Sequence, residues 1–167
     1  MSDEPRTSPR SVLFVCLGNI CRSPLAEGVF EQLAGEAGLQ DELRIDSAGT
    51  GSWHIGDPPD PRSIEVAQRH GVELRSRGRQ VSASDFREFD LILAMDRSNL
   101  QELQQIRDEL AQDEATAKLR LFREFDPEAD GDLEVPDPYF GGPGGFDTVY
   151  AMVLRGCREL LAEFERD

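Results

Sequence analysis

The stretch VCLGNICRSPLAEG (residues 15–28) decides the fold, because it joins an apolar run to a helical pattern through a short turn. The run before it, SVLFVC at 11–16, is rich in β-branched and aromatic residues, which predicts a short buried strand. The turn holds two cysteines, an arginine, a glycine and a serine within eight positions. The same few residues therefore connect the first expected strand to the first expected helix and contain the closest cluster of reactive and polar side chains in the chain.

A helix is expected over 24–37, where Leu25, Val29 and Leu33 recur at the spacing of one helix face. Its ends carry residues that favour helix boundaries. Ser23 is expected as the N-cap, Pro24 as the first helical residue and Gly38 as the C-terminal stop.

The rest of the chain alternates strand-like and helical segments. Such alternation predicts an α/β fold, here a single-domain three-layer α/β/α structure with a four-stranded parallel sheet and a Cys-x5-Arg phosphate loop after the first strand. Ligands bind such sheets at the carboxyl ends of the strands, where Cys16 is expected. Further strands are expected at 43–47, 89–95 and 119–122, further helices at 62–70, around 100–110 and over 146–164, and long loops at 50–61 and 126–145.

Length, composition and net charge exclude several classes of function. The 167 residues suggest one domain over 11–167, preceded by a solvated, flexible tail over 1–10 that lacks the apolar core of a secretion signal. The formal net charge of −15 argues against nucleic-acid partners and against binding to anionic membranes. No apolar run approaches the roughly 18 residues of a membrane span. Three cysteines, an odd number, argue against a disulfide framework and favour a reducing cytoplasm.

The turn after the first strand has the features of an anion site. Backbone N–H groups converge there, and the helix dipole adds partial positive charge. Gly18 permits close approach of the backbone to a ligand, and Asn19 tolerates a left-handed conformation. Helix N-termini and nearby cations favour the thiolate form of a cysteine, so Cys16 is a candidate nucleophile. Arg22 could reach back and bind two oxygens of a phosphate through its planar fork.

Two other interpretations of the turn compete with this one. Cys16 could be an ordinary buried thiol at a strand end, with Arg22 a solvated arginine. A zinc site is disfavoured, because Cys16 and Cys21 lack a second ligand pair and His54 and His70 are not at ligand spacing. Cys157 lies on an apolar helix face and is expected to be a core thiol. No metal and no cofactor are expected.

The segment Cys16–Ser23, followed by PLAE at 24–27, resembles the phosphate loop of the low-molecular-weight protein tyrosine phosphatases. The similarity continues in order along most of the chain, which makes coincidence implausible. It includes DSAG at 46–49, Trp53, DPR at 60–62, HG at 70–71, RQ at 79–80, DF at 85–86, MD at 95–96 and DPY at 137–139.

The resemblance implies a mechanism through a cysteinyl-phosphate. Cys16 would be the nucleophile, Arg22 the phosphate clamp and Asp137 the general acid that protonates the leaving phenolate. The chain contains four Asp-Pro pairs, and the family pattern alone selects Asp137 among them. The remaining implied residues are Leu17, Gly18, Asn19, Ile20, Cys21, Ser23 and Ser47 as phosphate-binding or loop-supporting residues, and Trp53, Tyr139 and Phe140 in the substrate cleft.

The chain departs from the family at two positions. Phe140 stands where a second tyrosine often follows Tyr139, and Ser76 stands where many members have histidine, which would weaken or rearrange the loop support. The implied partners are phosphotyrosine proteins and an opposing bacterial tyrosine kinase. Cys21 is expected to capture an oxidised Cys16 as a reversible disulfide.

Three other functions remain open on the sequence. An arsenate reductase would need a mobile further cysteine, and Cys157 does not suit that role. A protein-arginine phosphatase tends to carry threonine where Ile20 stands. A non-catalytic phosphotyrosine-binding module would be expected to lack the nucleophile or the acid, and candidates for both are present.

Overall fold

The sheet has four parallel strands in the order β2-β1-β3-β4. This computed structural model describes residues 9–142 and 144–165. The strands are β1 (Ser11–Cys16), β2 (Arg44–Gly49), β3 (Leu91–Ala94) and β4 (Lys118–Leu121). The helices are α1 (Arg22–Glu36), α2 (Pro61–Arg69), α3 (Asp85–Glu88), α4 (Arg97–Asp108) and α5 (Gly145–Glu165), with short 3-10 turns η1 (Gln112–Glu114) and η2 (Phe122–Phe125).

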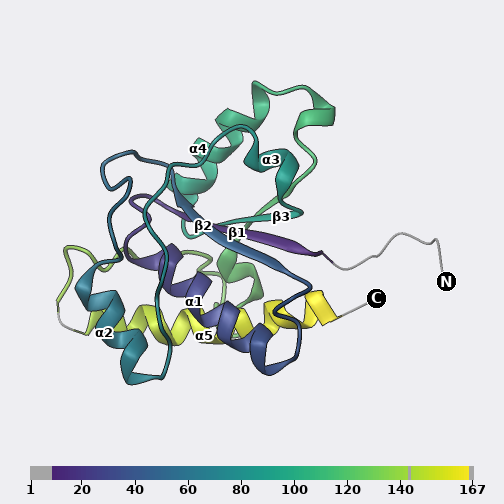
Figure 1. Cartoon of the computed structure of the whole chain (residues 1–167). Coiled ribbons are helices and arrows are strands. Elements are labelled where there is room, and N and C mark those ends of the chain that lie inside the picture. The colour runs from purple at the N-terminus through teal and green to yellow at the C-terminus, as the bar shows by residue number, and fades with distance from the viewer. Residues whose placement is uncertain (1–8, 143, 166–167) are drawn as a thin grey trace.

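Helices cover both faces of the sheet, which confirms the predicted three-layer α/β/α fold (Figure 1). α1, α2 and α5 lie on one face, and α3 and α4 lie on the other. Alternation along β1 explains the two cores, because successive side chains of a strand point to opposite faces. Phe14 joins the core under α1 and α5, whereas Leu13 and Val15 join the core under α3 and α4.

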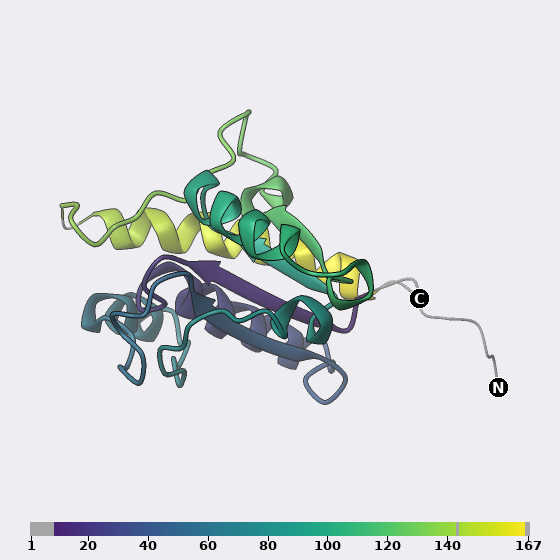
Figure 2. The same cartoon turned by 90° about the horizontal axis from the view of Figure 1, so that it is seen from above.

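The larger core is organised around phenylalanine rings. Phe14 makes edge-on contacts with Phe30 of α1 and Phe122 of η2, each with ring centroids 5.9 Å apart. α5 closes this core along the length of the molecule (Figure 2), and its predicted apolar positions are all buried. These positions are Phe146, Tyr150, Val153, Cys157, Leu160 and Phe164.

The strand order places the end of β1 at a topological switch point. The chain leaves β1 toward β2 on one side and later adds β3 on the other side. A crevice forms where the connections diverge in this way, at the carboxyl ends of the strands. Cys16 is the last residue of β1 and pairs in register with Gly49, the last residue of β2. Asp96 follows β3 closely and begins α4 as its N-cap.

Some expected boundaries need correction. Ser23 is not the N-cap of α1, which begins at Arg22 with Cys21 as N-cap, because the Ser23 hydroxyl is bonded to side chains of the preceding turn. Gly38 follows the end of α1 with φ of 77°, as its role as a stop requires. The second strand begins one residue late and continues to Gly49, and the third spans only Leu91–Ala94. The short α3, η1 and η2 were not expected.

The described chain also bears on the expected tail and on membranes. Residues 1–8 of the predicted 1–10 tail lie outside the described residues, whereas the backbone N–H of Arg10 donates to Asp90 at 2.7 Å. Between residues 9 and 165, leaving out position 143, no helix is long and apolar enough to cross a membrane.

Candidate active site

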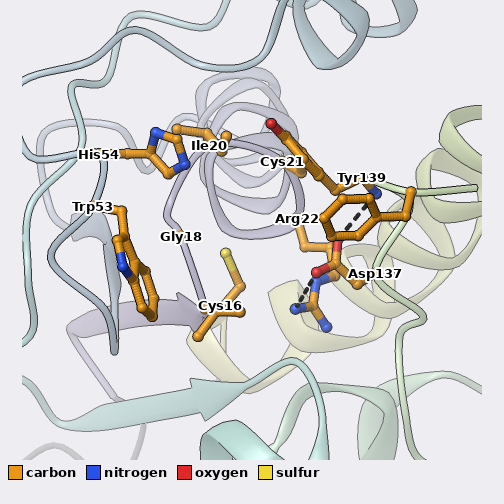
Figure 3. A pocket seen from close by; sticks show the side chains of 11 residues that line it. Cys16, Gly18, Ile20, Cys21, Arg22, Trp53, His54, Asp137 and Tyr139 are labelled. Atoms are coloured by element: carbon orange, nitrogen blue, oxygen red, sulfur yellow. Dashed lines mark hydrogen bonds and ion pairs between the residues drawn. The ribbon is translucent and has the colours of Figure 1, made fainter.

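A pocket of about 260 Å³ opens at the carboxyl end of β1 (Figure 3). It brings together residues from the turn after β1, the loop after β2 and the loop before α5. Most of the sequence-predicted site residues line it: Cys16, Leu17, Gly18, Ile20, Cys21, Arg22, Trp53, Asp137, Tyr139 and Phe140. Asn19, Ser23 and Ser47 are not part of the lining and lie buried behind the turn.

The turn at residues 16–21 has its carbonyl groups turned outward. The carbonyl oxygens of Cys16 and Leu17 accept hydrogen bonds from the backbone N–H groups of Thr50 and Gly51, both at 2.9 Å. Farther along the turn, the Ile20 carbonyl accepts a hydrogen bond from the Asp60 backbone N–H at 2.7 Å. Because the carbonyls are satisfied from outside, the N–H face of the turn is directed to its concave side.

The Cys16 thiol lies inside this concave turn. Its Sγ is 3.0 Å from Ser23 Oγ and accepts a hydrogen bond from the Asn19 backbone N–H at 3.3 Å. Asn19 has φ of 57°, the left-handed conformation that asparagine tolerates. The sulfur therefore has one hydroxyl and one main-chain N–H as polar neighbours, next to the start of α1.

The Asn19 side chain connects the turn to β2. Its Nδ2 donates to Ser23 Oγ at 2.8 Å and to Ser47 Oγ at 2.9 Å. Its Oδ1 accepts from the backbone N–H of Arg79 at 3.0 Å, which fixes which end of the amide faces the serines. Both serine oxygens therefore act as acceptors toward Asn19. Ser47 uses its own proton to donate to Glu27. The Ser23 proton then has two acceptors within reach, the Cys16 sulfur at 3.0 Å and the Ala48 carbonyl oxygen at 3.4 Å.

Arg22 is buried, with 2% of its side chain exposed, yet it carries a full positive charge. Its Nη1 donates to Asp96 Oδ2 at 2.7 Å and to the Val135 carbonyl at 2.9 Å, and its Nη2 lies 3.7 Å from Asp137 Oδ2. Burial disfavours the charged form, but the negative groups of Cys16, Asp96 and Asp137 outweigh it and raise the pKa of Arg22 above its ordinary value. The guanidinium is thus anchored on one side and faces the pocket on the other.

Asp137 faces Arg22 across the pocket with one of its two oxygens. Its Oδ1 accepts from the backbone N–H of Tyr139 at 3.1 Å, and its Oδ2 is the oxygen directed at the Arg22 guanidinium. Figure 3 shows both interactions, with the Cys16 sulfur to the left of the Asp137 carboxyl group. An acid at this place can deliver a proton to a group leaving from above the sulfur.

Aromatic side chains form the rim. Trp53 and Tyr139 stand on opposite sides of the pocket in Figure 3, and both are partly or largely exposed. Phe140 touches the Tyr139 ring with centroids 4.7 Å apart, but it is 93% exposed and therefore lies at the outer edge. Between them, Ile20 contributes an apolar wall that is only 8% exposed. A flat aromatic group fits between such walls.

The other two cysteines are buried thiols. Burial, followed by the negative groups of Asp60, Cys16 and Asp137, raises the pKa of Cys21 to about 12. Cys157 is fully buried between α1 and α5, and burial raises its pKa as well. The expectation that Cys157 is a core thiol is confirmed, and this removes the mobile cysteine that an arsenate reductase would need.

Sequence reasoning gave no role to four residues that build the site. Asp96 anchors Arg22 and caps α4, and its signal was an aspartate directly after a buried strand. His54 lines the pocket and pairs with Asp57 at 3.1 Å. Gly49 lies so close behind the turn that a Cβ there would be 2.7 Å from the Leu17 carbonyl oxygen. Glu27, which accepts from Ser47, had no distinguishing signal in the sequence.

Within the described ranges, no group of three or more His, Cys, Asp or Glu side chains is arranged to hold a metal ion. The charge needed to bind an anion in this pocket comes from Arg22 and the main-chain N–H groups.

Comparisons with known proteins found a matching family model and similar sequences over most of the chain. The family model of low molecular weight phosphotyrosine protein phosphatases matches residues 11–167. The low molecular weight phosphotyrosine protein phosphatase of Homo sapiens is 43% identical over 152 residues, which cover 91% of this chain and 94% of the relative.

Solved structures are similar over nearly the whole chain. The Drosophila arginine phosphatase DARP matches with a TM-score of 0.86 and 39% identity, covering 93% of this chain and 98% of the other. A protein tyrosine phosphatase from Entamoeba histolytica, with Hepes in its active site, matches with a TM-score of 0.84 and 39% identity, covering 93% and 96%.

Proposed function

This chain belongs to the low molecular weight phosphotyrosine protein phosphatase family, and we propose that it hydrolyses phosphotyrosine with Cys16 as nucleophile, Arg22 as phosphate clamp and Asp137 as general acid. The observation that carries these roles is the convergence of the three side chains in one pocket, with Asp137 Oδ2 3.7 Å from Arg22 Nη2.

The first step transfers the phosphoryl group to sulfur. The Cys16 thiolate attacks phosphorus while the bond from phosphorus to the tyrosine oxygen breaks, and Asp137 donates its proton to that oxygen. A phenolate has a pKa of about 10, so protonation makes it a much better leaving group. Arg22 and the inward N–H groups bind the equatorial oxygens, where charge gathers in the transition state.

The second step releases phosphate. Asp137, now a carboxylate, takes a proton from a water molecule as that water attacks phosphorus and the bond from sulfur to phosphorus breaks. The thiolate leaves with its charge stabilised by the Ser23 hydroxyl and the Asn19 N–H. The protonated Asp137 and the free thiolate are then ready for another cycle. Every proton and electron pair in this cycle is supplied by the residues, the ester and water.

The pocket walls support phosphotyrosine over phosphoarginine as substrate. Ile20 presents an apolar side chain beside the phosphate loop, where arginine phosphatases tend to have threonine, and Trp53 and Tyr139 suit a planar ring. The similarity to DARP makes the comparison worth measuring directly. We expect a higher kcat/KM for phosphotyrosine than for phosphoarginine, and the opposite order would favour an arginine phosphatase.

A test of the roles separates nucleophile from acid. Cys16→Ser should abolish turnover, because the hydroxyl is a far weaker nucleophile than the thiolate. Asp137→Asn should lower kcat/KM for phenyl phosphate by roughly 10²-fold or more, and by much less for 4-nitrophenyl phosphate, whose phenolate leaves without help. Equal loss on both esters would remove Asp137 from the acid role.

We further propose that Cys21 protects the nucleophile. Peroxide would oxidise the Cys16 thiolate to a sulfenic acid, and the Cys21 thiol would then displace water from it to form a disulfide that thiols reduce. Cys21 follows Cys16 by five positions on the same turn and lines the same pocket. The raised pKa of Cys21 slows this capture, because the thiolate is the attacking form.

The partners that we propose are phosphotyrosine-containing proteins and, as the opposing enzyme, a bacterial tyrosine kinase. A reducing cytoplasm suits a site that depends on a free thiol. Substrate trapping with the Cys16→Ser or Asp137→Ala variant in a native lysate would identify the proteins that carry the phosphotyrosine.

A further inference from the structure

The start of α2 touches both loops that form the active site. Its sequence is DPRS at residues 60–63, a motif to which the reaction steps above assign no role. Asp60 is the N-cap, and its carboxylate accepts from the Arg62 backbone N–H at 2.8 Å. The motif therefore has a rigid backbone at the place where its side chains reach the two loops.

On one side the motif holds the phosphate loop. The Asp60 N–H donates to the Ile20 carbonyl at 2.7 Å, and the Ser63 hydroxyl donates to the Cys21 carbonyl at 3.2 Å. Both bonds go to carbonyls at the C-terminal end of the phosphate loop, and Ser63 is fully buried. These contacts help turn the carbonyls away from the pocket.

On the other side the motif holds the loop that carries the acid. Arg62 Nη1 donates to the Tyr139 carbonyl at 3.1 Å, and its guanidinium lies 5.4 Å from the Tyr139 ring centroid. The same guanidinium lies 4.6 Å from the Phe146 ring centroid at the start of α5. This hydrogen bond joins the segment 137–142 to α2, while the Gly142 carbonyl accepts from the Gly145 N–H at the start of α5 at 3.1 Å.

Asp60 fixes the direction in which Arg62 points. Nε and Nη2 of Arg62 donate to Oδ1 and Oδ2 of Asp60, both at 3.0 Å. Asp60 is 8% exposed, and its hydrogen bonds to Arg62 lower its pKa, so the carboxylate stays charged at neutral pH. A two-point contact between a carboxylate and a guanidinium holds the plane of the guanidinium, which leaves Nη1 aimed at Tyr139.

We propose that Arg62 is a positioning residue for the general acid: it holds the Tyr139 backbone, which in turn orients Asp137. The inference rests on the proposed acid role of Asp137. Tyr139 is bound at both of its backbone groups, because its carbonyl accepts from Arg62 while its N–H donates to Asp137 Oδ1. With Oδ1 held in this way, the remaining oxygen Oδ2 is directed at Arg22 and the pocket. A carboxyl group on a loop without helix or strand needs such support to keep its proton at the leaving oxygen.

The test compares two esters and a matched control. Arg62→Ala should lower kcat/KM for phenyl phosphate by about tenfold, a fraction of the roughly 10²–10⁴-fold that a positioned acid contributes. For 4-nitrophenyl phosphate we expect less than about a threefold loss, since its leaving group needs little protonation. Arg62→Lys should recover little, because an ammonium group lacks the planar fork that binds both Asp60 oxygens while a third nitrogen reaches the Tyr139 carbonyl. Arg69→Ala, which removes the ion pair between α2 and Asp147 of α5 at 3.0 Å, should change neither ester.

A double variant decides whether Arg62 acts through Asp137. In an Asp137→Asn background, Arg62→Ala should cause no further loss on phenyl phosphate, because the group that it positions is already gone. Additive losses would overturn the proposal. If Asp137→Asn itself did not separate the two esters, the acid role in the proposed function would fail; if it did and Arg62→Ala did not, only the present inference would fail.

A second variant of the motif excludes a merely structural role. Ser63→Ala removes the bond to the phosphate loop, so it should weaken inhibition by inorganic phosphate and slow both esters alike. Arg62→Ala should leave phosphate inhibition within about twofold of the parent enzyme, because the Arg62 side chain binds Asp60 and Tyr139 and packs on Phe146, outside the phosphate loop. If Arg62→Ala instead matched Ser63→Ala in both measurements, α2 would support the phosphate loop alone and the proposal would be wrong.

Discussion

Asn19 shows how single residues set the direction of the hydrogen bonds behind the nucleophile. Its amide oxygen is held by the Arg79 N–H, so its two N–H donors must face Ser23 and Ser47. Each serine is then an acceptor toward Asn19 and has one proton to give elsewhere. For Ser23 the nearer acceptor is the Cys16 sulfur at 3.0 Å, and the farther one is the Ala48 carbonyl oxygen at 3.4 Å.

Glu27 lies at the far end of this network and is expected to make stability depend on pH. Burial is the main cause that raises its pKa to about 8, with Glu31 and Asp46 adding to the shift and the bond from Ser47 opposing it. Arg79 forms its ion pairs with Asp46 and Asp85, 3.1 Å away in each case. A buried carboxyl group flanked by acids keeps its proton to a higher pH than usual.

The sign of the pH effect follows from the proton count. Between a pH near the ordinary value of 4.5 and about 8, the folded chain binds more protons at Glu27 than the unfolded chain does. The free energy of unfolding therefore falls as pH rises through this window. Glu27→Gln, which imitates the neutral form, should remove this decline. We expect the Tm of the variant to exceed that of the parent at pH 8 by a few degrees more than at pH 5. Parallel Tm profiles of the two proteins would contradict the assignment.

Cys21 carries a prediction about oxidation. After exposure to peroxide and then dithiothreitol, the parent enzyme should recover most of its activity, because the disulfide is reducible. Cys21→Ser should recover much less, since a sulfenic acid without a partner is oxidised further to irreversible acids. Cys157→Ser is the matched control, because Cys157 is fully buried in the core away from the pocket. If Cys21→Ser recovered as much activity as the parent enzyme, the proposed protective role of Cys21 would be wrong.

At the scale of the elements, the phosphate loop keeps its shape because β2 lies directly behind it. Gly49 ends β2 and pairs in register with Cys16, and the N–H groups of Thr50 and Gly51 bind the first carbonyls of the loop. A conformation in which successive carbonyls point outward is stable only where each finds such a donor. The loop is therefore specified by its neighbours as much as by its own residues.

Gly49→Ala tests this contact. An added Cβ would lie 2.7 Å from the Leu17 carbonyl oxygen and 3.1 Å from the Asn19 nitrogen, both backbone atoms that cannot move without moving the loop. We expect a loss of stability of about 1–3 kcal/mol, typical of overpacking, together with at least a tenfold loss of affinity for inorganic phosphate. Gly35→Ala is the control, because a Cβ there meets nothing within 4 Å and α1 should gain about 0.5–1 kcal/mol. Unchanged phosphate affinity in Gly49→Ala would show that the loop does not depend on β2.

At the scale of the whole molecule, the charge distribution sets which substrates approach. The net charge of −15 creates a negative field around a pocket that must accept a doubly charged phosphate ester. Buried Arg22 and the loop N–H groups supply local positive potential, but the field farther out repels anions. Phosphopeptides with basic residues next to phosphotyrosine should therefore bind faster than acidic ones.

This preference can be measured through its dependence on salt. At low ionic strength, kcat/KM for a phosphotyrosine peptide flanked by lysines should exceed that for one flanked by glutamates several-fold. The ratio should shrink at high salt, where the Debye length falls to about 3 Å. A ratio that does not respond to salt would mean that local contacts, and not the field of the molecule, select the peptide.

The sequence by itself determined the fold class and the phosphate loop after the first strand, and it made Cys16 and Arg22 candidates for nucleophile and clamp, because these depend on local patterns. The apolar runs and the turn-forming residues between them predicted the four strands and the site at the end of the first strand. The stop at Gly38 follows from the residue type, and the left-handed conformation of Asn19 is one that its residue type tolerates. Asp137 could be chosen only through family resemblance, since four Asp-Pro pairs look alike in sequence.

Only the tertiary structure decided the strand order and everything that depends on it. The order β2-β1-β3-β4 brings Asp96 beside Arg22 across 74 positions of sequence, and Gly49 behind a loop that begins 33 positions earlier. The same packing explains why Ser23 is not the N-cap of α1, as was expected, and why its hydroxyl instead lies 3.0 Å from the Cys16 sulfur. The reason is that a short-range pattern states which conformation a segment prefers, whereas a hydrogen bond between distant segments exists only after the chain has been brought together.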